Sequence, residues 1–78
     1  MDPKGLVEML VKRLVDFPDE VNITVVEGER STILELRVNK SDVGKVIGKG
    51  GRIVSAIRTL LFAMAKSNDK RVMLEVIE

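Results

Sequence analysis

Cysteine and histidine are both missing from this chain of 78 residues. Without cysteine the chain can form no disulfide, no thiolate metal site and no cysteine nucleophile. Without histidine it lacks the commonest general base, a usual zinc ligand and a member of the familiar catalytic triads. The remaining carboxylates and lysines stand in no recognisable catalytic motif. We therefore expect a protein that is not an enzyme, with no cofactor, no metal site and no small-molecule substrate.

Long apolar runs are missing as well. The longest one, residues 60–65, is far shorter than the roughly 18 residues that a membrane-spanning helix needs. The first apolar segment contains the charged residues Glu8, Lys12 and Arg13, which are foreign to the apolar part of a signal peptide. These two features predict a cytoplasmic protein that does not enter a membrane.

What the chain does have is the composition of a folded domain. Hydrophobic residues make up 45% of it and charged residues 32%, a mixture typical of globular rather than disordered proteins. A chain of this size buries only roughly 60 to 65% of the surface that its unfolded form exposes. We expect a single domain over residues 1–78, with a core but without a deep cavity.

Hydrophobic periodicity predicts the order helix, strand, strand, helix, helix, strand. The predicted elements are a helix over residues 3–16, strands over 21–25 and 34–38, a short helix ending at Val46 or Ile47, a helix from Arg52 to about Lys66, a turn at 67–69 and a strand over 72–76. Asp2 is expected to cap the first helix, and Ser41 or Asp42 the second.

The connections predict the topology. A polar turn between the first two strands favours an antiparallel hairpin. The two helices that follow form a crossover, which should leave the last strand parallel to the second one. The expected fold class is therefore α+β, a three-stranded mixed sheet with three helices on one face. The long helix is expected to contribute Ile57, Leu60, Leu61 and Met64 to the core.

The other face of that sheet is rather apolar for a surface in contact with water. It is predicted to carry Val26, Ile33, Met73 and Ile77. Two interpretations remain open, namely tolerated apolar surface and a face that contacts a partner.

Positive charge is concentrated in one segment. The net charge of the chain is only +1, but residues 40–58 hold five basic residues and one acid, a local charge of +4. Such a patch is the electrostatic footprint of nucleic-acid binding.

The same segment contains the sequence VGKVIGKGGRIVSAIR, residues 43–58, which leads from a glycine-rich turn into the longest predicted helix. Unhindered backbone NH groups at a helix N-terminus favour anionic oxygens. A P-loop is excluded, because Gly44 and Gly48 have three residues between them instead of four and Lys49 is followed by glycine. A dinucleotide fingerprint that starts at Gly48 would need its third glycine where Ile53 stands. A plain connection between two helices remains as the alternative without a binding role.

Residues 46–54, Val-Ile-Gly-Lys-Gly-Gly-Arg-Ile-Val, resemble the Val-Ile-Gly-x-x-Gly core of the KH domain, an RNA-binding module. In that family a GXXG loop between two helices clamps the backbone of about four nucleotides. The predicted element order resembles the prokaryotic type II KH arrangement over essentially the whole chain. Further stretches at 18–20, 26–29 and 56–59 make the sequence similar to the bacterial KhpA family.

The resemblance implies which residues would bind RNA. The GXXG loop would hold phosphates through its backbone NH groups, and it consists of Gly48, Lys49, Gly50 and Gly51. Lys49 and Arg52 would add positive charge, whereas Lys45 and Arg58 would contribute mainly to the electrostatic field.

Apolar residues beside the loop have two possible roles, the floor of an RNA groove or the core beneath it. They are Val46, Ile47, Ile53 and Val54. The only aromatic residues, Phe17 and Phe62, are distant from the corner in the sequence. An aromatic stacking platform of the RRM kind is therefore not expected.

The resemblance also implies a function, namely non-enzymatic binding of single-stranded RNA in an RNA chaperone-like or post-transcriptional regulatory role. Members of the family self-associate or pair with a second KH protein of the Jag/KhpB type. Gly50 adds flexibility to the loop, so one domain should bind RNA weakly, and a dimer would offset this weakness. The alternative function is a protein-interaction module that uses the fold for dimerisation and binds RNA incidentally.

Overall fold

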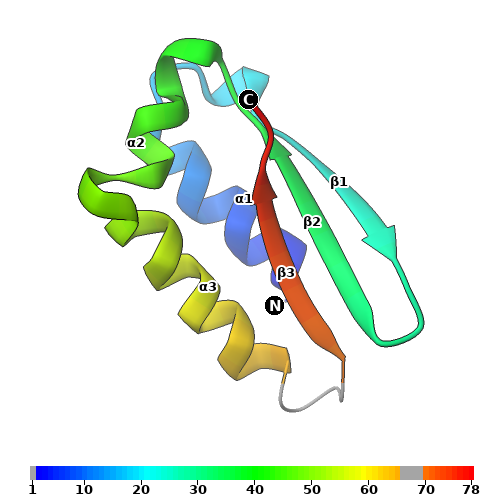
Figure 1. Ribbon diagram of the computed structural model, residues 1–78. Coiled ribbons are helices and arrows are strands. Elements are labelled where there is room, and N and C mark those ends of the chain that lie inside the picture. The colour runs from blue at the N-terminus through cyan, green and yellow to red at the C-terminus, as the bar shows by residue number, and fades with distance from the viewer. Residues whose placement is uncertain (1, 66–69) are drawn as a thin grey trace.

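The computed structural model describes residues 2–65 and 70–78, and its elements form a sheet with helices on one side (Figure 1). The helices are α1 (Pro3–Leu14), α2 (Val43–Ile47) and α3 (Arg52–Ala65), the strands are β1 (Asn22–Glu27), β2 (Ser31–Arg37) and β3 (Arg71–Val76), and three short 3-10 helices span Pro18–Glu20, Lys40–Asp42 and Lys49–Gly51. The turn predicted at 67–69 and the predicted helix end at Lys66 lie outside the described residues.

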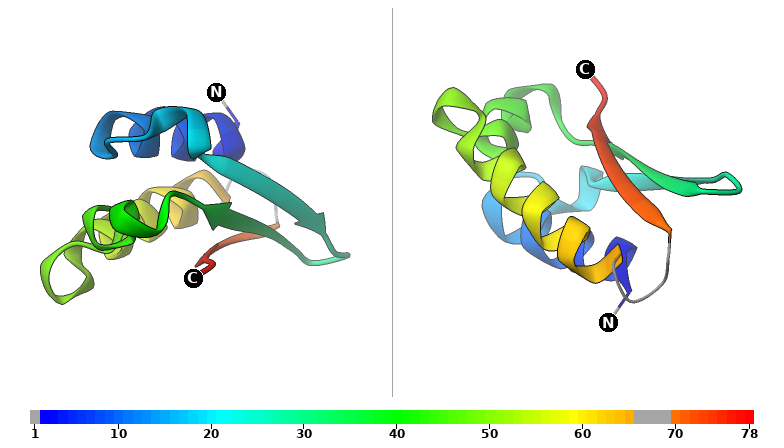
Figure 2. Two further views of the ribbon diagram at one scale, coloured as in Figure 1. Left: turned by 90° about the horizontal axis from the view of Figure 1, so that it is seen from above. Right: turned by 60° about the horizontal axis from the view of Figure 1, so that its bottom comes forward.

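The sheet has the predicted topology. Its strand order is β1-β2-β3, with β1 antiparallel to β2 and β3 parallel to β2. All three helices lie on the same side of it, as the two turned views show (Figure 2). The α+β fold class, the mixed sheet and the single layer of helices are thereby confirmed.

Helix α1 begins as the sequence predicts. The Asp2 side chain accepts a hydrogen bond of 2.9 Å from the Gly5 amide, and Pro3 occupies the first turn, where its missing NH costs nothing. The helix ends at Leu14, two residues before the predicted Asp16, and Val7 and Val11 are its fully buried residues.

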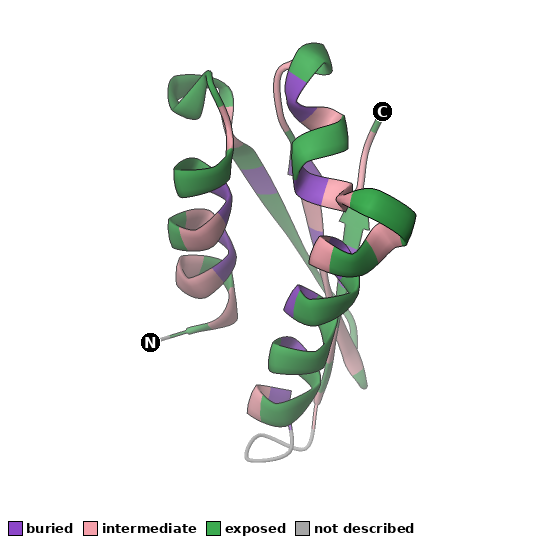
Figure 3. Cartoon of the chain, turned by 90° about the vertical axis from the view of Figure 1, so that its left-hand side faces the viewer, coloured by how far each residue is buried: buried purple, intermediate pink, exposed green. Residues whose placement is uncertain are grey.

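The core lies between the sheet and the inward sides of α1 and α3, where buried residues face one another (Figure 3). Its members are aliphatic: Val7, Val11, Ile23, Leu34, Leu36, Val46, Val54, Ile57, Leu61 and Leu74. A core without aromatic side chains depends on close packing of branched aliphatic residues.

Leu60 does not belong to that core, contrary to the prediction. It is 47% exposed, because α3 contacts the sheet through Val54, Ile57 and Leu61 at three- and four-residue spacing. In a helix, the residue just before Leu61 is rotated by about 100° away from the inward side. Met64, the other member of the predicted set, packs against the core while only partly buried.

The capping prediction for the second helix is also wrong. Asp42 stands at the N-cap of α2, but its side chain makes no capping hydrogen bond. Instead its carboxylate is buried and accepts hydrogen bonds from the amides of Asp16 and Phe17, at 3.1 and 3.0 Å. Ser41 is no cap either, because its hydroxyl donates to the Asn39 side chain at 2.7 Å. Asn39 caps the preceding 3-10 helix by accepting from the Ser41 amide at 2.9 Å. A long-range hydrogen bond has replaced the local one that the sequence predicted.

The open face of the sheet carries an apolar row. Val26 pairs with Ile33 in the register of β1 and β2, and Ile33 pairs with Met73 in the register of β2 and β3. Val26 and Met73 are both 43% exposed, which fits tolerated surface as well as contact. The two interpretations of this face therefore stay open.

Candidate nucleic-acid interface

Residues 48–51 form a tight bend between α2 and α3, at the edge of the molecule farthest from the sheet (Figure 1). Three of its four residues are glycines with positive φ, namely Gly48 at 78°, Gly50 at 61° and Gly51 at 76°. The Gly51 amide closes the bend by donating to the Gly48 carbonyl at 3.1 Å. The chain can turn this sharply because glycine adopts such angles without steric cost.

The glycines differ in what surrounds them. A Cβ at Gly48 would lie 2.7 Å from Cγ1 of Ile53, whereas a Cβ at Gly50 or Gly51 would meet nothing within 4 Å. Gly48 is therefore required by close packing as well as by its φ angle. Gly50 and Gly51 instead leave the outer side of the bend open for a ligand to approach the backbone.

Two cations stand beside this open backbone. Lys49 and Arg52 are both exposed, and neither forms an ion pair within the described part of the chain. Arg52 also starts α3, a helix of 14 residues, whose N-terminal end is electropositive. Backbone NH groups, a helix end and two cations without an ion pair are groups that favour anionic oxygens such as those of phosphate.

Lys45 is placed differently from these two. Its ammonium group pairs with Asp16 and, at 3.3 Å, with the buried carboxylate of Asp42. The hydrogen bond to Asp16, followed by the one to Asp42, raises the pKa of Lys45 above its ordinary value. Its charge is therefore matched by two carboxylates, unlike the charges of Lys49 and Arg52.

Asp42 joins this ion pair from a fully buried position. Burial alone would raise the pKa of its carboxyl, but hydrogen bonds from the Asp16 and Phe17 amides and from Lys45 outweigh burial and hold the pKa below its ordinary value. The carboxylate thus connects the turn after α1 to the start of α2, the helix that carries the glycine bend.

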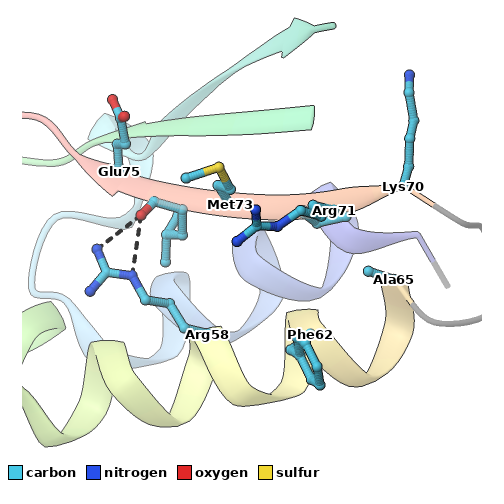
Figure 4. Close-up of a pocket in the computed structure, with 9 residues that line it drawn as sticks. Arg58, Phe62, Ala65, Lys70, Arg71, Met73 and Glu75 are labelled. Atoms are coloured by element: carbon cyan, nitrogen blue, oxygen red, sulfur yellow. Dashed lines mark hydrogen bonds between the residues drawn. The ribbon is translucent and has the colours of Figure 1, made fainter. Parts of the chain in front are cut away.

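Arg58 also has a structural partner. Its guanidinium donates two hydrogen bonds to the carbonyl oxygen of Leu74, from Nη2 at 2.9 Å and from Nε at 3.3 Å. The side chain therefore spans from α3 to the edge of β3 (Figure 4). Its charge remains without a carboxylate partner among the described residues.

The four apolar residues beside the bend divide between the two predicted roles. Val46 and Val54 are buried, at 0% and 6% exposure, and belong to the core. Ile47 and Ile53 are only partly buried and pack against that core. The first pair supports the bend from below, and only the second pair is open to a ligand.

A groove of about 550 Å³ runs between α3 and the free edge of β3 (Figure 4). The groove is lined by Arg58, Phe62, Ala65, Lys70, Arg71, Val72, Met73, Leu74 and Glu75. Phe62 is 65% exposed and was not expected at a ligand site. Its spacing of four residues from Arg58 places both on one side of α3, but only the tertiary structure shows that β3 lies opposite.

The edge of β3 presents backbone polar groups to this groove. The amides of Arg71 and Ile77 point toward β2. They donate to the carbonyls of Arg30 and Leu36, at 3.1 and 2.8 Å. Since alternate residues of a parallel strand bond to the same neighbour, Val72 and Leu74 turn their NH and C=O groups toward α3. Of these groups, the carbonyl of Leu74 accepts from Arg58.

Two other kinds of site do not appear in the part of the chain that the structure describes. No group of His, Cys, Asp and Glu side chains could hold a metal ion there. No helix among residues 2–65 and 70–78 is long and apolar enough to span a membrane.

The element order and the glycine bend between α2 and α3 define a type II KH domain. Comparison with known families agrees, because residues 4–76 match the KH domain of KhpA/KhpB. The chain belongs to this family.

Similar proteins from distant bacteria cover nearly the whole chain. A protein of Borreliella burgdorferi is 60% identical over 73 residues, which are 94% of this chain and 89% of that protein. One of Clostridium acetobutylicum is 55% identical over 95% of this chain and 99% of its own length. One of Aquifex aeolicus is 49% identical over 96% of this chain and 95% of its own length. Each of the three is named RNA-binding protein KhpA, and no solved structure matches the chain.

Proposed function

We propose that this protein binds single-stranded RNA without acting as an enzyme, and that the glycine bend clamps the backbone of about four nucleotides. The observation that carries the proposal is the open backbone at Gly50 and Gly51 beside the unpaired cations Lys49 and Arg52. The names of the relatives support the choice of RNA. Phosphates would lie at the bend and bases would enter the groove between α3 and β3, where the NH and C=O groups of Val72 can pair with base edges.

This arrangement favours single strands, because bases must leave a duplex before their edges can reach the groove. It also fits weak binding by one domain, since a bend rich in glycine loses conformational entropy when a ligand fixes it. In the cytoplasm such a protein would act as an RNA chaperone or post-transcriptional regulator, binding and releasing many RNAs.

The double variant Lys49→Asp, Gly50→Asp tests the clamp. Asp tolerates the left-handed angles of Gly50, and a Cβ there meets no neighbour, so the variant should fold. We expect it to bind a degenerate RNA of about eight nucleotides at least about tenfold more weakly, as when a charge-assisted phosphate contact is lost. Fluorescence anisotropy at low and high salt measures this, and wild-type affinity should fall with salt.

The double variant Lys4→Asp, Arg13→Gln provides the matched control. It lowers the net charge by the same amount, at exposed positions on α1. We expect it to bind RNA almost as tightly as the wild type does. If the two double variants weaken binding equally, the effect is one of total charge and the clamp is wrong.

A second copy, or a KH protein of the KhpB type, is the partner we propose for the outer side of α3. There the exposed Leu60 lies between Ala56 and Ala63, at spacings of four and three residues, so the three form one apolar stripe. Small residues on both sides of Leu60 allow another helix to approach closely. This exposed stripe is the observation that favours a dimer.

Leu60→Glu should abolish self-association, because it places a charge at the centre of the stripe. Sedimentation equilibrium should show a monomer at concentrations where the wild type dimerises, while Lys12→Glu, on α1, leaves the dimer intact. RNA affinity should fall only by the avidity that the dimer adds. An unchanged monomer–dimer equilibrium in Leu60→Glu would rule out this side of α3.

A further inference from the structure

We infer that the end of the groove beside Phe62 is a stacking subsite for one additional nucleobase, beyond the nucleotides held at the glycine bend. This inference rests on the proposed function, because it extends the same RNA-binding groove. Its elements are Phe62 on α3 and Arg71 on β3, which line the same end of the groove (Figure 4).

The position of Phe62 makes this a second subsite. Ten residues of α3 separate Phe62 from Arg52, which corresponds to about 15 Å along a helix. Arg58 lies between the two and also lines the groove. An RNA strand that follows α3 away from the bend therefore reaches Phe62 only after it has passed Arg58.

The side chains at this end suit a nucleobase. Phe62 is 65% exposed although it is apolar, and it is not a member of the core. An aromatic ring stacks on every base, since each base has a π-face.

The charges at this end suit a phosphate. Arg58, Lys70 and Arg71 line the groove together with one acid, Glu75. Lys70 pairs with Glu27, and this hydrogen bond lowers the pKa of Glu27. Arg71 forms no ion pair within the described part of the chain, so its guanidinium is available for the phosphate of a stacked nucleotide.

An added peptide strand fits the groove less well than a nucleotide does. Strand addition needs a free row of NH and C=O groups along an edge. At β3 the row is interrupted, because Arg58 donates to the Leu74 carbonyl at 2.9 Å, and α3 runs beside the edge (Figure 1). A nucleobase needs only one or two of these groups.

Phe62→Leu tests the subsite, because leucine keeps an apolar side chain but removes the ring. The probes are fluorescein-labelled oligouridylates of about four and about eight nucleotides. We expect Phe62→Leu to weaken binding of the longer probe about tenfold and to leave binding of the shorter probe unchanged. Phe62→Trp should restore the affinity for the longer probe.

Phe17→Leu is the matched control, since Phe17 is also exposed, at 46%, but does not line the groove. The subsite is wrong if Phe62→Leu weakens binding of both probes equally, or of neither probe. If the Lys49→Asp, Gly50→Asp variant still loses binding of both probes in that case, only the clamp is supported. If the wild type binds neither probe, the clamp and the subsite both fail. If Phe62→Leu changes only the monomer–dimer equilibrium, this end of the groove is a protein interface and the inference is overturned.

Discussion

Gly48→Ala should destabilise the domain more than any other single change in the glycine bend. The backbone of Gly48, at φ 78° and ψ 172°, lies in a region that essentially only glycine adopts, and other residues pay about 1–3 kcal/mol there. The added methyl group would also lie 2.7 Å from Ile53, and such overpacking costs about 1–3 kcal/mol. Small domains have only about 5 kcal/mol in total. Thermal unfolding should therefore show a Tm lower by at least roughly 10 °C.

Gly50→Ala is the matched comparison for Gly48→Ala. Gly50 also has positive φ, 61° with ψ 21°, but this is the ordinary left-handed region, where the cost is about 1–2 kcal/mol. No neighbour lies within 4 Å of the added Cβ. We expect a smaller drop in Tm than for Gly48→Ala. Equal drops in the two variants would show that neither the rarer backbone region of Gly48 nor its contact with Ile53 adds a cost.

Asp42→Ala should also be strongly destabilising. It leaves the amides of Asp16 and Phe17 without their acceptor and removes one of the two carboxylates beside Lys45. Buried donors without a partner are strongly destabilising. Urea unfolding should show a larger loss of stability than for Asp2→Ala, whose exposed helix cap is worth about 1 kcal/mol.

The same carboxylate should make the fold sensitive to acid. Since the pKa of Asp42 is lower in the folded protein than its ordinary value, the folded state holds the proton less tightly than the unfolded state. Its contribution to stability is complete above the ordinary carboxyl pKa and is lost as the pH falls below about 4 and through the lowered value. Asp42→Asn should unfold with a shallower dependence on pH in this range. An identical pH profile for Asp42→Asn and the wild type would exclude Asp42 as the titrating group.

Much of the architecture and the bend itself could be predicted from sequence because their signals are local. Alternation, helical periodicity and the glycine spacing depend on neighbouring residues, and the structure confirms the elements they predict. The hydrogen-bond partners of Lys45 and Arg58, in contrast, could not be predicted from the sequence. Lys45 pairs with Asp16, 29 residues away, and Arg58 with the Leu74 carbonyl, 16 residues away. Their basic character was visible, but the groups that share their charge come together only in the fold.

Asp42 and Phe62 also have surroundings that the local sequence could not predict. Asp42 has the residue type and position of a helix cap, but the turn after α1 supplies two amides that bind its carboxylate from the other side. Phe62 is distant from the bend in the sequence, and only the parallel crossover places β3 beside it. Residues of one helix and one strand make this groove, so neither segment alone carries the signal for it.

Helix α2 has only five residues, too few for an isolated helix to persist in water. Asp42 ties its beginning to the turn after α1, and Val46 fixes its last turn in the core. Local unfolding of α2 must therefore break contacts of the whole core, so α2 and α1 belong to one cooperative unit. The bend at 48–51 is held by backbone hydrogen bonds from Gly48 to Gly44, from Gly51 to Gly48 and from Arg52 to Lys49. The two helices therefore hold the ends of the bend in place, and the room to adjust to a ligand is limited to its outer residues, Gly50 and Gly51.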